Sequence, residues 1–447
     1  MSGLRIEIRG IVQGVGFRPW VYRIAHELGV AGRVHNHARG VTVDAFGGDA
    51  VLATLVARLR TAPAPAQVRD LVAEPIPEEP ARDFVIVESA AGGARVFSIP
   101  PDLATCPDCE REIHDPANRR HGYAFTNCTH CGPRFTIATG VPYDRPETTM
   151  APFAMCPACR REYDDPRDRR FHAQPNACPV CGPRLALWSA AGVPLTERDP
   201  LAAAVARIAR GEIVAIKGLG GFHLACDATD EAALATLRAR KHRDEKPFAV
   251  MVADLAEARA LAVISPAEAA LLASPERPIV LVARRPGAAI ARGVAPETEL
   301  VGLMLPYTPL HHLVLAAAAR PLVMTSANPS DEPICSDNAE AVARLGHIAD
   351  AFLVHDREIA TRCDDSVARV IAGRPTLLRR SRGYVPRAIA LPRPVERPVL
   401  AVGALLKNTF CIATGDNAYL GPHIGDLENV AALDFFEAAV ARMETIL

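Results

Sequence analysis

The 447-residue sequence has no excess of charge of either sign and no long apolar run. Its 50 lysines and arginines stand against 51 aspartates and glutamates, a balance that provides no global basic field for nucleic acid. No stretch reaches the roughly 18 uncharged apolar residues that a membrane helix requires, and the opening MSGLRIEIRG contains no apolar leader. We therefore expect a cytoplasmic protein without a membrane or nucleic-acid partner. Its length predicts about three domains.

A disulfide framework is also not expected, although the sequence has 12 cysteines. Eight of them form four CxxC pairs and the other four are scattered, which favours metal binding in a reducing compartment. The pairs belong to an internal repeat with a period of 50 residues. CPDCEREIHDPANRR…CTHCGPR at 106–134 returns as CPACRREYDDPRDRR…CPVCGPR at 156–184, and each copy contains CxxC-x18-CxxC.

Four thiolates complete a tetrahedral zinc shell, so the repeat predicts two structural Zn²⁺ sites. The predicted ligands are Cys106, Cys109, Cys128, Cys131, Cys156, Cys159, Cys178 and Cys181. Either each copy holds its own ion, or the outer CxxC pairs share one ion and the inner pairs the other. Unmetallated or redox-active pairs are the alternative to both. Because 11 arginines face 10 acidic residues between 106 and 184, we expect this module to fix neighbouring domains rather than to bind RNA.

The N-terminal pattern predicts a ferredoxin-like β-α-β-β-α-β unit. The expected strands and helices are, in order, a strand at 4–9, a helix after Arg18, strands at 30–36 and 40–46, a helix at 49–60 and a closing strand at 83–88. The proline-rich stretch 63–80 is interpreted as a long connection inside the unit, and 90–105 as a linker.

Three glycines and an arginine follow the first expected strand, in GIVQGVGFRPW at 10–20. Glycine lets a bound group approach the backbone, so successive N–H groups can surround an anion, and Arg18 offers a charged fork for phosphate oxygens. A plain strand-to-helix turn with a solvent-facing arginine is the alternative. The residues that follow favour the phosphate site, because an asparagine, Asn36, stands 18 residues after the arginine.

This combination, GIVQGVGFR followed by Asn36, resembles the acylphosphatase signature over about residues 4–90. The resemblance implies that Arg18 binds the phosphate of an acyl phosphate and that Asn36 orients the attacking water. The phosphate-binding loop would consist of Gln13, Gly14, Val15, Gly16 and Phe17. An acyl phosphate has a good leaving group, so charge stabilisation and a positioned water suffice without a serine or cysteine nucleophile.

Alanine-rich helical segments alternate with β-branched runs such as EIVAIKG and PLVMTSA after residue 200, which predicts an α/β domain ending near 390. KHRDEKPF at 241–248 brings Lys241, Arg243 and Lys246 close together, and TSANPS places Ser326 and Asn328 after an expected strand. Alone, the first motif could be a solvated charge run. Together they resemble the YrdC-like family of nucleotide-binding domains.

The YrdC-like resemblance spans about 200–385 and implies a concave site for ATP and an acyl-adenylate. Its basic residues would bind the triphosphate and the pyrophosphate leaving group, and its hydroxyl and amide groups would orient the acyl end. Three further residues are placed at this site: Lys217, Ser366 and Arg379.

The order of these parts resembles the HypF family of hydrogenase-maturation carbamoyltransferases along the whole chain. The resemblance implies a multidomain α+β protein. Its expected divisions are an acylphosphatase-like domain at 1–90, two four-cysteine zinc fingers at 106–184, a YrdC-like domain at 200–390 and the start of a further α/β carbamoyl-transfer domain at 397–447. The implied chemistry is hydrolysis of carbamoyl phosphate, formation of carbamoyl-adenylate from ATP with Mg²⁺, and carbamoylation of the C-terminal cysteine of the partner HypE, toward the cyanide ligands of nickel–iron hydrogenase.

The last fifty residues contain the hairpin-like VLAVGALLKNTFCIAT and a helical run from about 429, too little to bury a core independently. The sequence ends at Leu447, ahead of the family's downstream histidine metal motif, so transfer to HypE is expected to be weak or absent.

Two other functions compete with the carbamoyltransferase. A threonylcarbamoyl-adenylate synthase for tRNA modification shares the YrdC-like motifs, but the acylphosphatase loop argues against it. A zinc-dependent RNA-binding or scaffold protein with degenerate enzymatic domains is opposed by intact Arg18, Asn36, Lys241 and Arg243.

Overall fold

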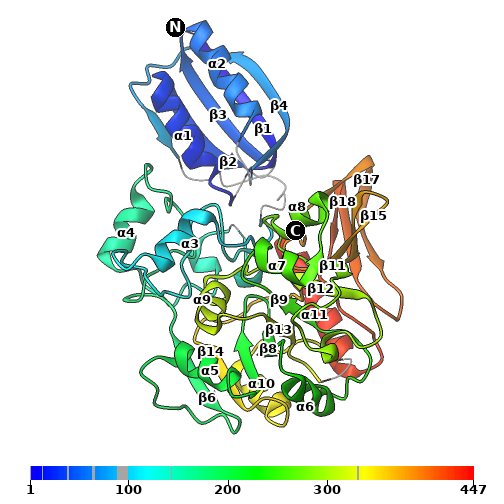
Figure 1. Cartoon of the computed structure of the whole chain (residues 1–447). Coiled ribbons are helices and arrows are strands. Elements are labelled where there is room, and N and C mark those ends of the chain that lie inside the picture. Colours follow the sequence, from blue (N-terminus) through cyan, green and yellow to red (C-terminus); the bar gives the residue numbers. More distant parts are fainter. Residues whose placement is uncertain are drawn as a thin grey trace.

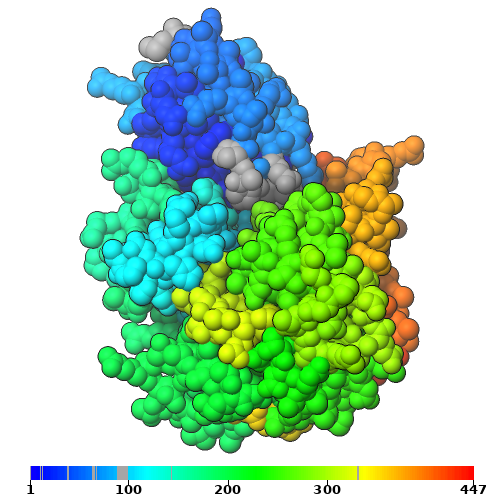
Figure 2. All heavy atoms as spheres, in the orientation of Figure 1, coloured from blue at the N-terminus to red at the C-terminus, as the bar shows by residue number. Residues whose placement is uncertain are grey.

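The computed structural model describes residues 2–12, 14–37, 40–62, 66–87, 99–141, 143–329 and 332–447. In Figure 1 an N-terminal lobe (blue) stands above the rest of the chain, and the cysteine repeat (cyan) lies between this lobe and a large α/β unit (green to orange). Figure 2 shows the lobe seated on the surface formed by the other parts. None of the helices within these ranges is long and apolar enough to cross a membrane.

The N-terminal lobe is a five-stranded sheet with two helices, in the strand order β4-β1-β3-β2-β5. Its elements are β1 Ser2–Ile11, α1 Phe17–Leu28, β2 Ala31–His37, β3 Gly40–Gly47, α2 Asp49–Arg60, β4 Gln67–Ile76 and β5 Phe84–Ile86. Both helices bury an apolar face in one core with the sheet, including Val21 of α1 and Leu55 of α2. The ferredoxin-like arrangement is confirmed.

One part of the N-terminal prediction is wrong. Residues 63–80 are not simply a connection, because β4 occupies Gln67–Ile76 and pairs antiparallel with β1. The one proline inside this strand, Pro75, is compatible with it because β4 lies at the edge of the sheet, where a missing N–H donor costs little. The closing strand of the pattern is therefore β4, and β5 is an addition at the opposite edge. Of the expected linker at 90–105, residues 90–98 lie outside the described residues.

The cysteine module contains two short helices 50 residues apart, as the repeat requires. They are α3 Pro107–His114 and α4 Pro157–Asp164, and each begins directly after the first cysteine of its copy. Proline at the first helical position favours this start because its fixed φ suits a helix and no N–H is lost. Two single-turn helices, η1 Phe135–Ile137 and η2 Arg145–Glu147, lie between the copies.

The α/β unit is built on an 11-stranded mixed sheet, ordered β16-β15-β11-β12-β9-β13-β8-β7-β14-β6 with β10 beside β11. The strands are β6 Leu185–Ser189, β7 Val214–Lys217, β8 Phe222–Asp227, β9 Ala249–Met251, β10 Ala262–Val263, β11 Ile279–Arg284, β12 Leu300–Met304, β13 Leu322–Ser326, β14 Ala351–His355, β15 Val367–Ile371 and β16 Arg374–Arg379. The helices are α5 Pro200–Ile208, α6 Glu231–Lys241, α7 Leu255–Leu261, α8 Pro266–Leu272, η3 Arg292–Val294, α9 Pro309–Ala318 and α10 Asn338–Leu345.

The central strands of this sheet, such as β7 and β8, are buried on both faces. Along β7, Val214 and Ile216 enter one apolar cluster while Ala215 enters the other. A central strand that is covered on both faces has a continuous apolar sequence. The β-branched runs that predicted the α/β unit have this pattern.

The C-terminal residues form a hairpin and a helix: β17 Ile389–Val402, β18 Phe410–Leu420 and α11 Val430–Ile446. Their core is shared, because Phe410 and Met443 pack in one cluster with Phe135 of the cysteine module and Val385 of the α/β unit. This agrees with the expectation that the last fifty residues do not bury a core alone.

Candidate metal centres and phosphate sites

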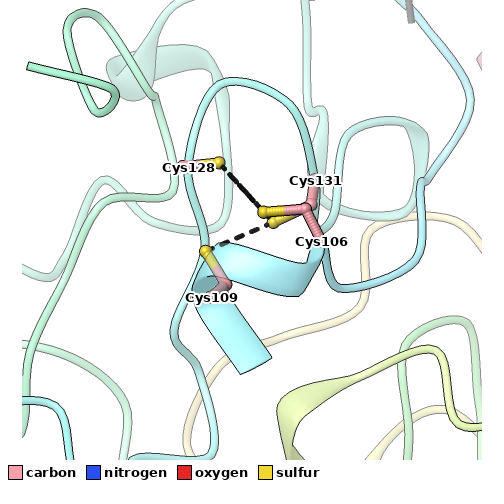
Figure 3. Close-up of side chains that lie close together, drawn as sticks. All are labelled: Cys106, Cys109, Cys128 and Cys131. Atoms are coloured by element: carbon pink, nitrogen blue, oxygen red, sulfur yellow. Dashed lines mark hydrogen bonds between the residues drawn. The ribbon is translucent and has the colours of Figure 1, made fainter. Parts of the chain in front are cut away.

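Each cysteine repeat brings its four sulfurs together. In the first copy (Figure 3) the Sγ–Sγ distances are 3.7 Å for Cys106–Cys128, 3.8 Å for Cys128–Cys131 and 3.5 Å for Cys131–Cys109. In the second copy the matching distances are 3.7, 3.7 and 3.6 Å. Four Zn–S bonds of about 2.3 Å in a tetrahedron give S–S edges of about 3.8 Å. Both clusters therefore fit zinc.

The ligand sets settle the pairing that the sequence left open. Cys106, Cys109, Cys128 and Cys131 form one group, and Cys156, Cys159, Cys178 and Cys181 form the other, with all ligand atoms of a group within 4.8 Å of one another. Each copy thus builds its own centre, and shared outer and inner pairs are wrong. The helix starts explain the geometry, since the first CxxC of each copy lies at the N-terminus of α3 or α4.

The two copies exchange arginines across their interface. Arg119 of the first copy donates from Nη2 to Cys159 Sγ of the second at 3.3 Å. Reciprocally, Arg169 donates from Nη1 to Cys109 Sγ at 3.1 Å. Guanidinium donors to thiolates offset the excess negative charge of a four-cysteine zinc centre. These arginines belong to the RR pairs at 119–120 and 169–170 of the repeat, and the sequence alone does not show which groups they contact.

The neighbouring arginines extend the exchange to carboxylates. Arg120 is buried and donates to both oxygens of Glu162 at 3.0 and 2.6 Å, and Arg170 binds Glu112 in the same way. Burial raises the pKa of Glu162, but hydrogen bonds from Arg120 and Arg119 outweigh it and lower that pKa to about 2. Glu162 therefore stays charged and keeps its ion pairs with Arg119 and Arg120.

The glycine-rich loop joins β1 to α1 with two left-handed residues. Gly14 has φ 64° and Gly16 has φ 74°, conformations that a side chain disfavours and glycine accepts. Phe17 opens α1, whose first turn contains no acidic residue and receives no side-chain cap. Backbone N–H groups at such a helix start form an anion site. Gln13, also predicted for this loop, lies outside the described residues.

The sheet register places Asn36 at the end of the sheet where β1 leads into the loop. Val41 of β3 pairs with Ile8 of β1 on one side and with Asn36 of β2 on the other. Asn36 Oδ1 is buried, and no described residue donates a hydrogen bond to it. An acceptor left in this state can take a hydrogen bond from a water molecule.

Arg18 lies in the first turn of α1 and forms no hydrogen bond to another residue within the described ranges. Burial lowers the pKa of its guanidinium, while the negative charges of Asp144 and Tyr163 act in the opposite direction. Arginine remains protonated under such a shift. The loop, Arg18 and Asn36 together could hold a phosphate and a water.

Three residues predicted for the second site are joined by hydrogen bonds. The Lys241 ammonium, at the end of α6, donates to Ser326 O at 2.9 Å, Asn328 O at 2.6 Å and Asn328 Oδ1 at 2.9 Å. Ser326 Oγ donates to the same Asn328 Oδ1 at 2.9 Å. Burial, assisted by the positive charge of Arg243, lowers the pKa of Lys241 to about 7.

The other basic residues of this motif lie on the loop that follows α6. Arg243 donates from Nε to Lys246 O at 3.1 Å and from Nη2 to Pro247 O at 2.7 Å, and it lies over the Phe248 ring. The side chain of Lys246 is exposed. The loop thus presents positive charge beside the Lys241 cluster.

Lys217 is buried at the end of β7 and donates to His355 O at 3.2 Å. Burial, with the positive charge of Arg357, lowers the pKa of Lys217 to about 8. It lines a cavity of about 20 Å³ between the cysteine module and the α/β unit, together with Phe125 and Tyr307. Within the described part of the chain, Lys217 forms no hydrogen bond to Lys241, Ser326 or Asn328.

Ser366 and Arg379 both lie at the β15–β16 pair, and each has its own hydrogen-bond partners. Ser366 Oγ is fully buried, donates to Arg382 O and accepts from Ser381 N–H. Arg379 Nη1 donates to Asp364 at 3.3 Å. The hydroxyl of Ser366 is therefore occupied by internal hydrogen bonds.

The sequence reasoning missed a buried network beside Ser366. Asp365 contacts His223 Nε2 at 2.9 Å and accepts from Arg382 Nε at 2.7 Å, and Arg382 stacks on Tyr307 at 3.4 Å. Although burial opposes it, the Arg382 charge holds the pKa of Asp365 well below its usual range. His223 and Asp365 are 142 residues apart, and a single histidine or aspartate in the sequence does not indicate its partner.

Four family profiles match successive parts of the chain. They are Acylphosphatase at residues 4–86, HypF finger at 105–138 and 155–188, Telomere recombination (the Sua5, YciO and YrdC group) at 206–381, and HypF Kae1-like domain at 394–447.

Relatives match along the same length. Carbamoyltransferase HypF2 of Cupriavidus necator is 54% identical over 466 aligned residues, covering 99% of this chain, and carbamoyltransferase HypF of Synechocystis is 48% identical, covering 100%. The chain belongs to the HypF family. A crystal structure of full-length HypF in the phosphate- and nucleotide-bound form superposes with a TM-score of 0.94 at 43% identity, covering 100% of the chain. The chain spans 58% of the length of each of these HypF proteins.

Proposed function

We propose that this chain performs two consecutive steps of HypF carbamoyl chemistry: hydrolysis of carbamoyl phosphate in the N-terminal lobe and adenylation of the released carbamate in the α/β unit. One observation carries the proposal. Asn36 Oδ1 is buried, has no hydrogen-bond partner among the described residues, and lies at the end of the sheet that carries the glycine loop. Membership of the HypF family supports the same assignment. The structural role of the zinc fingers follows from their position between the two sites.

In the first step the loop N–H groups and Arg18 hold the phosphate. Asn36 Oδ1 accepts a hydrogen bond from a water molecule and orients it toward the acyl phosphate. Water adds, the bond between the carbamoyl group and the phosphate breaks, and carbamate and inorganic phosphate leave. Catalysis rests on positioning and on stabilising charge on the phosphate, which an anion site with a fixed guanidinium provides.

In the second step a carbamate oxygen attacks the α-phosphorus of ATP and pyrophosphate leaves, which gives carbamoyl-adenylate. We assign Lys241, Arg243 and Lys246 to the phosphates, because this part of the α/β unit presents them together. Ser326 and Asn328 would orient the carbamate through hydroxyl and amide groups. Mg²⁺ bound with ATP would neutralise further phosphate charge. Lys217, Ser366 and Arg379 are proposed as further members of this site.

The acceptor and the domain limits are part of the proposal. By family membership, the carbamoyl group would pass to the C-terminal cysteine of HypE. We divide the chain into an acylphosphatase-like domain at 1–90, zinc fingers at 106–184, a YrdC-like domain at 200–390 and the beginning of the transfer domain at 397–447.

The test is incubation of the purified chain with ATP, Mg²⁺ and labelled pyrophosphate, with either carbamoyl phosphate or threonine plus bicarbonate. We expect carbamoyl phosphate to release inorganic phosphate and to stimulate exchange of pyrophosphate into ATP. Exchange driven by threonine and bicarbonate, with no response to carbamoyl phosphate, would assign the α/β unit to threonylcarbamoyl-adenylate synthesis instead.

A further inference from the structure

The first zinc finger touches the phosphate loop through one buried arginine. Arg134, which follows the second CxxC of the first copy, donates from Nε to Gly14 O of the loop at 3.1 Å. Its other donors bind the finger itself: Nη1 binds Pro133 O at 2.7 Å, and Nη2 binds Cys128 O and Thr129 O, both at 3.0 Å. One planar guanidinium thus ties the loop to the segment that carries a zinc ligand.

The same segment supports the loop at a second point. A side-chain carbon built on Gly16 would lie 2.9 Å from Thr129 Oγ1, so the backbone of the loop rests directly against this threonine. Thr129 in turn donates from Oγ1 to Arg169 O at 3.0 Å. Arg169 is the arginine that binds Cys109 Sγ. A continuous series of contacts therefore links the loop to the first cysteine cluster.

The contact with Gly14 O bears on an N–H group of the anion site. In a planar trans peptide the carbonyl and the next N–H point in opposite directions. Arg134 holds the Gly14 carbonyl toward the finger, so the N–H of Val15 is directed away from the finger. Gly14 and Gly16 both have left-handed φ values and neither has a side chain to restrict rotation. The peptide plane between Gly14 and Val15 depends on an outside contact for its orientation.

The second finger does not repeat this arrangement. Arg184 occupies the position equivalent to Arg134, but its side chain is exposed, and its backbone N–H donates to Asp356 of the α/β unit at 2.8 Å. Pro179 stands where the first copy has Thr129. The repeat therefore supplies a matched comparison within one chain.

We propose that Arg134 is a positioning residue of the acyl-phosphate site: it fixes the peptide plane that aims the Val15 N–H at the bound phosphate, and so makes the first zinc finger part of that site. The inference rests on the proposed hydrolysis for its chemistry. Its structural consequence, the affinity of the loop for phosphate, can be measured without turnover.

The experiment compares Arg134→Lys with Arg184→Lys in the full chain. Lysine keeps the charge but loses the planar fork that reaches all four carbonyls. Titration calorimetry with inorganic phosphate gives Kd, with Arg18→Ala as the reference for binding elsewhere. We expect Arg134→Lys to raise Kd about tenfold and to lower kcat/KM for carbamoyl phosphate about 10- to 100-fold, at unchanged zinc content. Arg184→Lys should leave the Kd for phosphate unchanged.

Thr129→Leu provides a second route if Arg134→Lys does not fold, since it keeps every cysteine and Arg134 but crowds Gly16. It should also weaken phosphate binding. A folded, zinc-loaded variant with wild-type Kd would overturn the positioning role. A wild-type chain that binds phosphate at Arg18 but hydrolyses no carbamoyl phosphate would refute the proposed function, while the variants still decide the inference. A wild-type chain that binds no phosphate at Arg18 would overturn both.

Discussion

The two proposed phosphate sites differ in how their polar groups are arranged in the absence of a ligand. In the N-terminal lobe the donors are backbone N–H groups and an arginine that forms no hydrogen bond within the described ranges, and Asn36 Oδ1 is buried without a partner there. In the α/β unit the Lys241 ammonium is already bound to Ser326 and Asn328, and Arg243 to its own loop. The first site is organised for a ligand before one arrives. The second must exchange internal hydrogen bonds for those of the ligand, which reduces net affinity.

Of the substitutions that test this difference, Arg18→Ala should have the largest effect on activity. It removes the guanidinium assigned to the phosphate, so hydrolysis of carbamoyl phosphate should fall by about a hundred- to a thousandfold. Phosphate release measures this loss, and circular dichroism checks the fold. Arg58→Ala, on an exposed face of α2, is the matched control. A folded Arg18→Ala variant with near-normal hydrolysis would remove this role.

Arg243→Ala should have the next largest effect, at the other site. Loss of a guanidinium contact to the phosphates should reduce carbamoyl phosphate-stimulated pyrophosphate exchange about a hundredfold. Hydrolysis in the N-terminal lobe should not change. Arg240→Ala, one turn away on α6 and paired with Asp350, is the control. If exchange survives in Arg243→Ala, the phosphates are held by other residues.

Asn36→Ala tests whether Asn36 contributes to turnover rather than to phosphate binding. Orienting water matters mainly in the transition state, so kcat should fall about 10- to 100-fold while the Kd for inorganic phosphate stays near the wild-type value. Steady-state kinetics and calorimetry give the two numbers. Weaker phosphate binding with unchanged turnover would contradict this division.

The pH dependence of ATP binding should distinguish the second site from the first. Lys241 has a pKa of about 7, lowered by burial, so raising the pH neutralises it in the free protein. ATP affinity should therefore fall between about pH 7.5 and 9, by at most tenfold per pH unit. Lys241→Arg should flatten this profile because arginine stays charged. A wild-type profile that is already flat would show that the Lys241 charge does not bind the nucleotide.

The smallest change concerns the module between the sites. Cys106→Ser should reduce bound zinc from two ions to about one and loosen the first finger. Elemental analysis of anaerobically purified protein counts the metal. Ser265→Ala, far from either cluster in sequence, serves as the control. Absence of zinc from wild-type protein supplied with the metal would refute both centres.

Fixed spacings predicted most of the candidate sites. The CxxC-x18-CxxC repeat identified all eight cysteines of the two clusters, and the motifs around Lys241, Ser326 and Asn328 identified residues that contact one another. Such motifs place chemistry within a few residues of a strand or helix end, where local structure determines the geometry. The same local reasoning gave the helix at 49–60 without error.

Contacts between distant parts of the chain could not be predicted in this way. Arg134 and Gly14 are 120 residues apart, and no local pattern links them. The arginine exchange between the fingers depends on how two copies pack, which their common sequence does not state. β4 was missed for a different reason: prolines are dense around it, and the one inside it, Pro75, is tolerated because the strand lies at an edge.

The reciprocal arginines also bear on the ancestry of the finger pair. Each copy carries the side chains that its twin requires, Arg119 for one cluster and Arg169 for the other. A recombination event that deleted one copy would leave the survivor's two arginines without the twin's thiolate and glutamate, and its own thiolate and glutamate without the twin's arginines. The duplication therefore cannot be undone in a single genetic step without damage, and descendants must inherit the two copies together.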